Sequence, residues 1–417
     1  MTFCKVPSVR RAYKVRAYPD ESQEAIFNRT LGCVRLVWNK TLADRQHRYT
    51  VEQASTSYKQ TDAALTGWKR TDELAFLNEV SSVPLQQTLR HQHTAFSNFF
   101  KGRARYPKFK SRNGRQCAHY TRSAFRMKVD GLWLAKTSAP LRLAWSWPDI
   151  ELAELDPTMV VISREPDGRW FATLCVDQPD PAPAMPTGQS VGVDLGIKDF
   201  ATLSTGEKIA NPRHLARHER GLRRQQKRLA RMKRGSSNRA KQRKKVARKH
   251  ARVRDARRDF LHKTSTGLVT TNDLVAVEDL NVAGMVRNHK IAKSISDAGW
   301  GQFRSMLTYK TEQAGKRLVV IDRWYPSTKT CSSCGHLLVS ISLGTRYWTC
   351  PDCGTRQDRD INAAKNILVA AGLAETRNAC GADVRPQGTS LRQSAVKQEN
   401  LYVSAGIPIP RVGRMSI

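Results

Sequence analysis

Residues 331–368 read CSSCGHLLVSISLGTRYWTCPDCGTRQDRDINAAKNIL. Two Cys-x-x-Cys pairs, Cys331 with Cys334 and Cys350 with Cys353, are separated by fifteen residues. Zn²⁺ prefers four thiolates in a tetrahedron, and each tight turn supplies two of them, so this spacing predicts a structural zinc ribbon. Four protein ligands complete the coordination shell and leave no open position for catalysis. The ribbon would hold the segment that leads into the following alanine-rich helix.

Three carboxylates stand at places where an unpaired buried charge is costly. Asp194 interrupts the alternating apolar strand at 191–195, Glu278 ends the apolar run 274–277, and Asp360 begins the helix after the cysteines. Each has an ordinary explanation alone: a hairpin turn for Asp194, an arginine partner for Glu278, and a helix N-cap for Asp360. Strand ends and helix starts can converge on one crevice of an α/β sheet, so the three together favour a Mg²⁺ site facing a phosphodiester.

The composition points to a polyanionic partner. The chain has 417 residues, with 71 Lys and Arg against 36 Asp and Glu, a formal net charge of +35. This excess indicates nucleic acid bound through phosphate contacts, the alternative being a generally basic protein. The N-terminus lacks an apolar signal region, and no run of 18 apolar residues predicts a membrane span. Cys4, Cys33, Cys117, Cys175 and Cys380 form no disulfide framework, so we expect a reducing, cytoplasmic, nucleoid-associated location without membrane contact.

Two basic segments are candidates for nucleic-acid contact. Residues 211–260 hold 21 Lys or Arg against three acids, and the turn-forming residues 234–238 split them into a helical hairpin that is either an RNA- or DNA-binding surface or a solvated one. Residues 99–121 interleave aromatic and basic side chains, which suits phosphate contact with base stacking or a basic loop whose rings pack inward. The candidate contacts are Lys101, Arg103, Arg105, Lys108, Lys110, Arg223, Arg224, Lys227, Arg228, Arg243, Lys244 and Lys245.

The remaining pattern indicates a multidomain α+β protein. Residues 5–19 predict a strand, the following segment to about residue 100 is helical with Asp20 as a cap candidate, and 122–176 contain several strand-like runs. A Pro-rich, apolar-poor segment that ends at residue 190 indicates a linker. After it, strands and helices alternate, which is typical of α/β architecture.

Four motifs resemble the TnpB family: VGVDLGIKDFATLSTGE, VAVEDLNVAGM, YPSTKTCSSCG and CPDCGTRQDRDINAAKNIL. The resemblance covers roughly residues 1–380. It implies a β-barrel-like wedge domain with an inserted helical recognition lobe, then an RNase H-like (RuvC) α/β nuclease domain with an inserted zinc ribbon. The domains expected are the wedge at 1–19 and 116–180, the helical lobe at 20–115, the linker at 181–190, the nuclease domain at 191–330 and 354–380, the ribbon at 331–353 and a disordered tail at 381–417.

The resemblance also implies an activity. TnpB proteins are transposon-encoded RNA-guided DNA endonucleases related to type V CRISPR effectors. A guide RNA from the transposon end pairs with one strand of double-stranded DNA, next to a short motif that the protein reads. Asp194, Glu278 and Asp360 match the family's catalytic acids, which hold Mg²⁺, two ions being expected, while Asp358 is a neighbour.

Two alternative activities remain open at this stage. One is a guide-independent transposase or resolvase of the RNase H type, and the other is an RNA-guided repressor that does not cleave. The presence of all three acids argues against the repressor. The sequence leaves the oligomeric state, the adjacent DNA motif and the guide undetermined.

Overall fold

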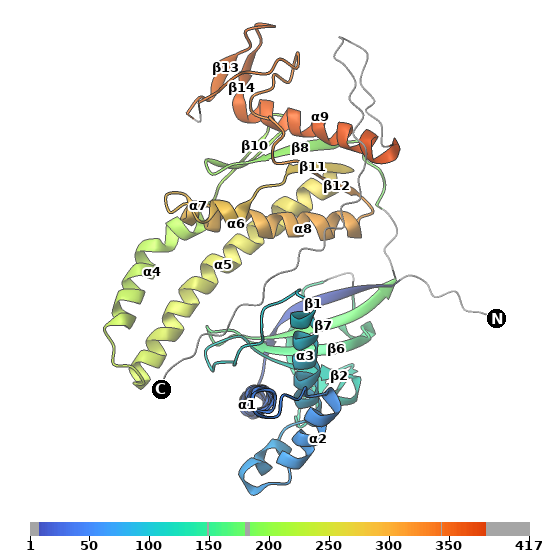
Figure 1. Cartoon of the computed structure of the whole chain (residues 1–417), viewed down its shortest axis with the longest axis vertical. Helices are drawn as coiled ribbons and strands as arrows, with labels where there is room; N and C mark the ends of the chain where they lie inside the picture. Colours follow the sequence, from blue (N-terminus) through green and yellow to red (C-terminus); the bar gives the residue numbers. More distant parts are fainter. Residues whose placement is uncertain (1–7, 148–149, 180–183, 343, 381–417) are drawn as a thin grey trace, which may run out of the picture. The chain divides into compact units, whose positions relative to one another are not determined.

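The computed structural model describes residues 8–147, 150–179, 184–342 and 344–380 (Figure 1). The tail expected to be disordered, 381–417, lies outside the described residues. Within the described part, helices and strands form two regions, each built around a five-stranded sheet.

The first sheet is antiparallel, with strand order β2-β6-β7-β1-β5. β1 alternates buried Tyr13, Val15 and Ala17 with residues that are more exposed, which is the pattern of a strand with one face on a core. Its ladder with β7 pairs residues from Ser8 to Ala17. The strands are β1 (Ser8–Tyr18), β2 (Gln116–Thr121), β5 (Arg142–Ala144), β6 (Pro157–Arg164) and β7 (Trp170–Pro179), with a separate hairpin of β3 (Phe125–Lys128) and β4 (Gly131–Leu134).

This sheet has two edges. Among the described residues no ladder joins β2 to β5, so the expected barrel-like domain is an open sheet at the level of backbone pairing. The residue pattern of 99–121 indicated no strand, whereas the family resemblance assigned residues from 116 onward to the β-barrel-like domain, and β2 forms there.

Three helices share a hydrophobic core with this sheet. They are α1 (Glu21–Glu52), α2 (Tyr58–Trp68) and α3 (Ser82–Phe100). Asp20 caps α1 as predicted: its Oδ1 accepts from the backbone N–H of Gln23, and the Gln23 side chain accepts from the N–H of Asp20. Phe27, Leu31 and Val34 lie on the buried stripe of α1.

The second sheet has the order β10-β9-β8-β11-β12. β8, β11 and β12 are parallel, whereas β8, β9 and β10 form an antiparallel meander. The strands are β8 (Ser190–Leu195), β9 (Asp199–Leu203), β10 (Lys208–Ala210), β11 (Leu274–Glu278) and β12 (Arg317–Ile321).

Helices cover both faces of this sheet (Figure 1). Val275 and Val277 of β11 pack into one core with α5 (Ser237–Thr271) and α8 (Trp300–Gln313). Ala276, which points to the opposite face, packs with α9 (Arg359–Cys380). Trp300, Phe303, Met306 and Leu307 recur at helical spacing and are buried along one side of α8.

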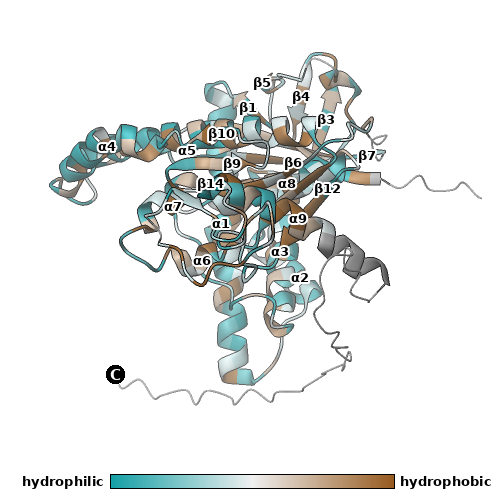
Figure 2. Cartoon of the chain, turned by 90° about the horizontal axis from the view of Figure 1, so that it is seen from above, coloured by the Kyte–Doolittle hydropathy of each residue, from teal (hydrophilic) through white to brown (hydrophobic). Residues whose placement is uncertain are grey.

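The basic segment forms the predicted helical hairpin, α4 (His214–Ala230) with α5. Figure 2 shows α4 and the adjoining part of α5 mostly in the hydrophilic colour. Two short helices, α6 (Val282–Met285) and α7 (Ala292–Ala298), follow β11. No helix in the described part of the chain is long and apolar enough to span a membrane.

Candidate functional site

Asp194 and Glu278 lie on neighbouring parallel strands at matching positions. Val193 of β8 pairs with Val277 of β11, and each acid is the next residue of its strand. Neighbouring strands lie about 4.8 Å apart and side chains alternate between faces, so both acids point to the face opposite Val193 and Val277. Because Val193 and Val277 belong to the core with α5 and α8, the acids face α9.

A glycine lets α9 approach β8 closely at this point. A Cβ atom at Gly192 would lie 2.0 Å from the carbonyl oxygen of Ala364 and 2.9 Å from the backbone nitrogen of Leu368. The backbone of α9 therefore rests directly on β8, two residues before Asp194. Asp360 is four residues before Ala364, hence on the same side of the helix. The third acid is thus brought to the place where the first two lie.

The ordinary explanations for the three acids do not hold in this structure. Asp194 is inside β8, opposite Thr202 of β9, and not in a turn. Glu278 makes no ion pair among the described residues and accepts a hydrogen bond from the Ser327 hydroxyl. Asp358, not Asp360, caps α9, because its Oδ1 accepts from the backbone N–H of Asp360 at 3.0 Å and of Ile361 at 3.1 Å.

The electrostatics of the acids reflect their proximity. Burial, together with the charges of Glu278 and Asp360, raises the pKa of Asp194 to about 7. Burial also raises the pKa of Glu278, while the hydrogen bond from Ser327 lowers it. Carboxylates in such surroundings are fully ionised at neutral pH only with the help of a cation.

Two arginine side chains pair with Asp360. Its Oδ2 is 3.1 Å from Nη1 of Arg346, in the segment between the two cysteine pairs, and its Oδ1 is 3.0 Å from Nη2 of Arg359. Among the described residues, the four cysteines are the group whose ligand atoms lie close enough together for one metal ion. The carboxylate oxygens of the three acids are not that close to one another. Both carboxylate oxygens of Asp360 are held by arginines in this arrangement.

A buried amide pair, which the sequence analysis missed, joins α9 to the segment that contacts Glu278. Asn366 donates its Nδ2 to the carbonyl oxygens of Ser327 at 2.7 Å and Thr330 at 2.6 Å. Asn362 donates to Thr330 and accepts from the N–H of Ser332. The i,i+4 spacing of Asn362 and Asn366 beside apolar helix residues was the available signal. The helix that carries Asp360 is therefore tied to the loop whose Ser327 holds Glu278.

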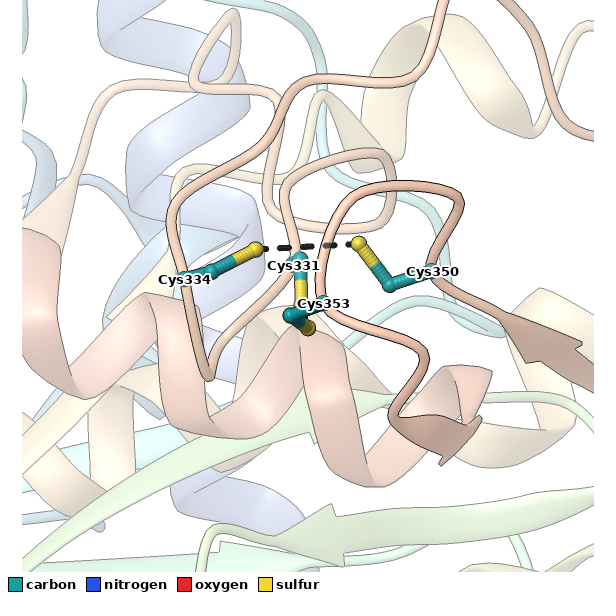
Figure 3. Close-up of side chains that lie close together, drawn as sticks. All are labelled: Cys331, Cys334, Cys350 and Cys353. Atoms are coloured by element: carbon teal, nitrogen blue, oxygen red, sulfur yellow. Dashed lines mark hydrogen bonds between the residues drawn. The ribbon is translucent and has the colours of Figure 1, made fainter.

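The four cysteines converge as their spacing predicted (Figure 3). Their Sγ atoms all lie within 4.8 Å of one another, with 3.7 Å between Cys331 and Cys353 and 3.6 Å between Cys334 and Cys350. Tetrahedral Zn–S bonds of about 2.3 Å require sulfur atoms about 3.8 Å apart, so the arrangement fits such an ion. β13 (Tyr347–Thr349) and β14 (Arg356–Asp358) pair and lead from this cluster into α9.

Comparison with known proteins identifies the family. A protein from Streptomyces pristinaespiralis, provisionally named an RNA-guided DNA endonuclease, is 54% identical over 404 residues, which cover 96% of this chain and 98% of that protein. The chain belongs to the TnpB family. InsQ of Escherichia coli K12, provisionally given the same activity, is 28% identical, with 92% of this chain and 96% of that protein covered.

Family models and one solved structure agree with this TnpB assignment. The OrfB_IS605 model, described as a probable transposase, matches residues 173–289, the Cas12f1-like TNB domain matches 300–367, and a helix-turn-helix domain matches 8–53. The fold resembles that in the cryo-EM structure of a Cas12f1–sgRNA–target DNA complex, with a TM-score of 0.53 at 13% identity, covering 86% of this chain and 98% of that one.

The basic candidates of this TnpB chain are mostly exposed. Those on α4 and α5 and four of the five in the 99–121 stretch point to solvent, whereas Lys110 is half-buried with its Nζ 3.9 Å above the ring of Trp38. Some aromatic rings of this stretch pack against other rings, as in the loop interpretation, and others are exposed, as base stacking would require. Tyr106 packs edge-on against Phe99, while the side chain of Phe100 is 77% exposed. Lys110 is therefore a poor candidate for phosphate contact.

Proposed function

We propose that this chain is an RNA-guided DNA endonuclease of an insertion-sequence transposon. The observation that carries the proposal is the meeting of Asp194 and Glu278 on adjacent parallel strands under the start of α9, which brings Asp360 to them. The family relationship supports the same conclusion. The identical register of the two strand acids explains why residues more than eighty positions apart serve one site.

Asp194, Glu278 and Asp360 fit Mg²⁺ because they are hard oxygen donors, and Mg²⁺ binds through a few carboxylates together with substrate phosphate. An ion held there would supply activation of the attacking water and stabilisation of the leaving oxygen of a phosphodiester. Two side chains of the protein position the acids: Ser327 donates a hydrogen bond that orients Glu278, and Asp358 caps the first turn of α9, which carries Asp360. Arg346 keeps a guanidinium beside Asp360, in reach of a phosphate that approaches the acids.

The four cysteines fit a structural zinc ion. They leave no open coordination position, so the ion serves the fold and not the reaction. Gln357 donates its amide to the Cys331 Sγ at 3.0 Å, a contact that orients this thiolate. The ribbon in turn presents Arg346 to the acids, so loss of zinc would disturb the site indirectly.

The exposed basic residues supply the surface for RNA and DNA. Arg223, Arg224, Lys227 and Arg228 crowd one stretch of α4, and Arg243, Lys244 and Lys245 face solvent on α5. Such a density of positive charge suits contact with the phosphates of a nucleic-acid backbone, and such contacts do not depend on the nucleotide sequence. Base pairing with the guide would then supply the sequence specificity, while the protein would hold the heteroduplex by its shape and backbone.

The test is purification followed by cleavage. We expect one defined RNA species to copurify, and the complex to cut double-stranded DNA that matches it when Mg²⁺ is present. Asp194→Ala should abolish cutting and leave target binding intact, whereas the matched surface variant Asp259→Ala should cut normally. Unchanged cutting by the Asp194 variant would disprove the acid assignment. Full cutting by RNA-free protein would instead favour a guide-independent transposase or resolvase.

A further inference from the structure

One large aromatic side chain, in the segment that contacts Glu278, is largely exposed to solvent. Trp324, in the turn that follows β12, is 85% exposed. Within the described part of the chain it makes no ring stacking, cation–π or side-chain hydrogen-bond contact. A tryptophan ring offers about 150–250 Å² of mostly apolar surface, so its exposure is unfavourable unless something covers it during function.

The turn holds this ring outward in a defined position. The carboxylate Oδ1 of Asp322 accepts from the backbone N–H of Trp324 at 2.7 Å, and the carbonyl oxygen of Asp322 accepts from the N–H of Tyr325 at 3.1 Å. Tyr325 packs against the core formed with α9, and the N–H of Ser327 donates to the Tyr325 carbonyl at 2.8 Å. Since Tyr325 is anchored inside, its neighbour is presented to solvent on a braced turn.

The turn that carries Trp324 lies between two residues that pair with or contact Glu278. Ile321, three residues before Trp324, pairs with Glu278 in the β11–β12 ladder. Ser327, three residues after it, donates to Glu278. Three residues span at most about 11 Å of chain, so the indole stands within a few nucleotides of any strand held at Glu278. Arg323, directly before it, reaches back to pair with Asp279.

We propose that Trp324 stacks on a nucleobase of the DNA strand held at the acids. The inference rests on the proposed function and adds a substrate contact to it. A base is the occupant that fits, because the chain has a net charge of +35 and the turn of Trp324 lies within three residues of Ile321 and Ser327, which pair with and contact Glu278. Stacking is indifferent to base identity, which suits a nuclease whose specificity comes from pairing with a guide.

The test combines a protein variant with a DNA lesion, using the complete protein–guide RNA complex. An abasic nucleotide is moved one position at a time along the cleaved strand of a DNA target that is already unpaired. Stacking of one base on an aromatic side chain corresponds to roughly a 5- to 150-fold effect. We expect Trp324→Ala to slow cleavage of intact strand within that range, Trp324→Phe to retain most of the rate, and Tyr309→Ala, an exposed aromatic of α8, to cut normally.

The decisive readout is the coupling between lesion and variant. At one position the abasic nucleotide should slow the wild-type complex but leave the rate of the Trp324→Ala complex unchanged. Additive effects at every position, or a Trp324→Ala rate equal to wild type, would overturn the assignment. If Trp324→Ala changed the sedimentation mass of the complex, and its cleavage defect did not depend on the position of the abasic nucleotide, the proposal would be overturned in favour of contact between Trp324 and a second copy of the protein. Cleavage of intact DNA by wild type keeps these results separate from failure of the proposed function.

Discussion

Replacement of Gly192 by alanine probes the contact that brings Asp360 to the other acids. The added Cβ would lie 2.0 Å from the carbonyl oxygen of Ala364 and 3.0 Å from the Cβ of Leu368, whereas ordinary contacts begin near 3.4 Å. The obstacle is helix backbone, which cannot rotate away, so α9 must retreat from β8 by roughly 1 Å or more. Overpacking of this kind costs about 1–3 kcal/mol of unfolding free energy, and a backbone obstacle places this case near the upper end.

The same displacement acts on catalysis. A misplacement of about 1 Å at a reacting group can cost on the order of 100-fold in rate. We therefore expect Gly192→Ala to lower the single-turnover cleavage rate by roughly that factor, even at saturating Mg²⁺, and to accelerate amide hydrogen exchange in residues 361–371. Guide RNA and target binding should stay near the wild-type level, because the substitution lies away from the basic surfaces.

Gly267→Ala is the matched control. Gly267 lies inside α5, and a Cβ atom added there would meet no atom within 4 Å, so alanine should stabilise the protein by about 0.5–1 kcal/mol. If Gly192→Ala unfolded at the same urea concentration as wild type and cut DNA at the same rate, the close packing of α9 on β8 would be wrong. The proposed convergence of the three acids would then lose its structural basis.

Three further predictions concern the positioning hydroxyl, the cysteines and a buried imidazole. Ser327→Ala should raise the Mg²⁺ concentration for half-maximal cleavage and slow the reaction about tenfold, since a hydrogen bond to a charged group contributes about 1.5–3 kcal/mol; an unchanged Mg²⁺ dependence would contradict this role. Cys350→Ser should reduce bound zinc, measured by elemental analysis, from one equivalent to none and lower the melting temperature, whereas Cys175→Ser should keep full zinc. Burial lowers the pKa of His119 to about 4, so stability present above pH 6.5 should be lost as the pH falls toward 4. The free energy of unfolding of wild type, measured by urea titration, should fall over this window by on the order of 3 kcal/mol more than that of His119→Phe. Parallel pH curves for the two proteins would refute the shift.

The carboxylates near the cysteines show where local reasoning was insufficient. Asp358 and Asp360 are both two positions or fewer from the start of α9, and either residue type makes a good N-cap. The structure assigns the cap to Asp358, which also pairs with Lys208 of β10 at 2.6 Å. The Lys208 contact joins Asp358 to a strand 150 residues away, and no local pattern contains that information.

Residues 116–121 illustrate the same limit from the other direction. Their basic and aromatic neighbours were compatible with a nucleic-acid-binding segment or with a basic loop whose rings pack inward, and they form β2, paired along its whole length with β6. A strand at the edge of a sheet needs one partner and little apolar content, so its own composition is a weak signal. The partner strand decided the conformation.

The features that the sequence determined by itself are those set by residues close in the chain. The two cysteine pairs, the cap of α1 and the buried stripe of α8 follow from spacing within a few residues, because covalent geometry already holds such residues near each other. The tertiary structure alone decided that Asp194 and Glu278 share a register and that α9 rests on Gly192. Those contacts join segments more than eighty residues apart, and their formation depends on parallel strand pairing and on helix packing across a sheet, which only the assembled core selects.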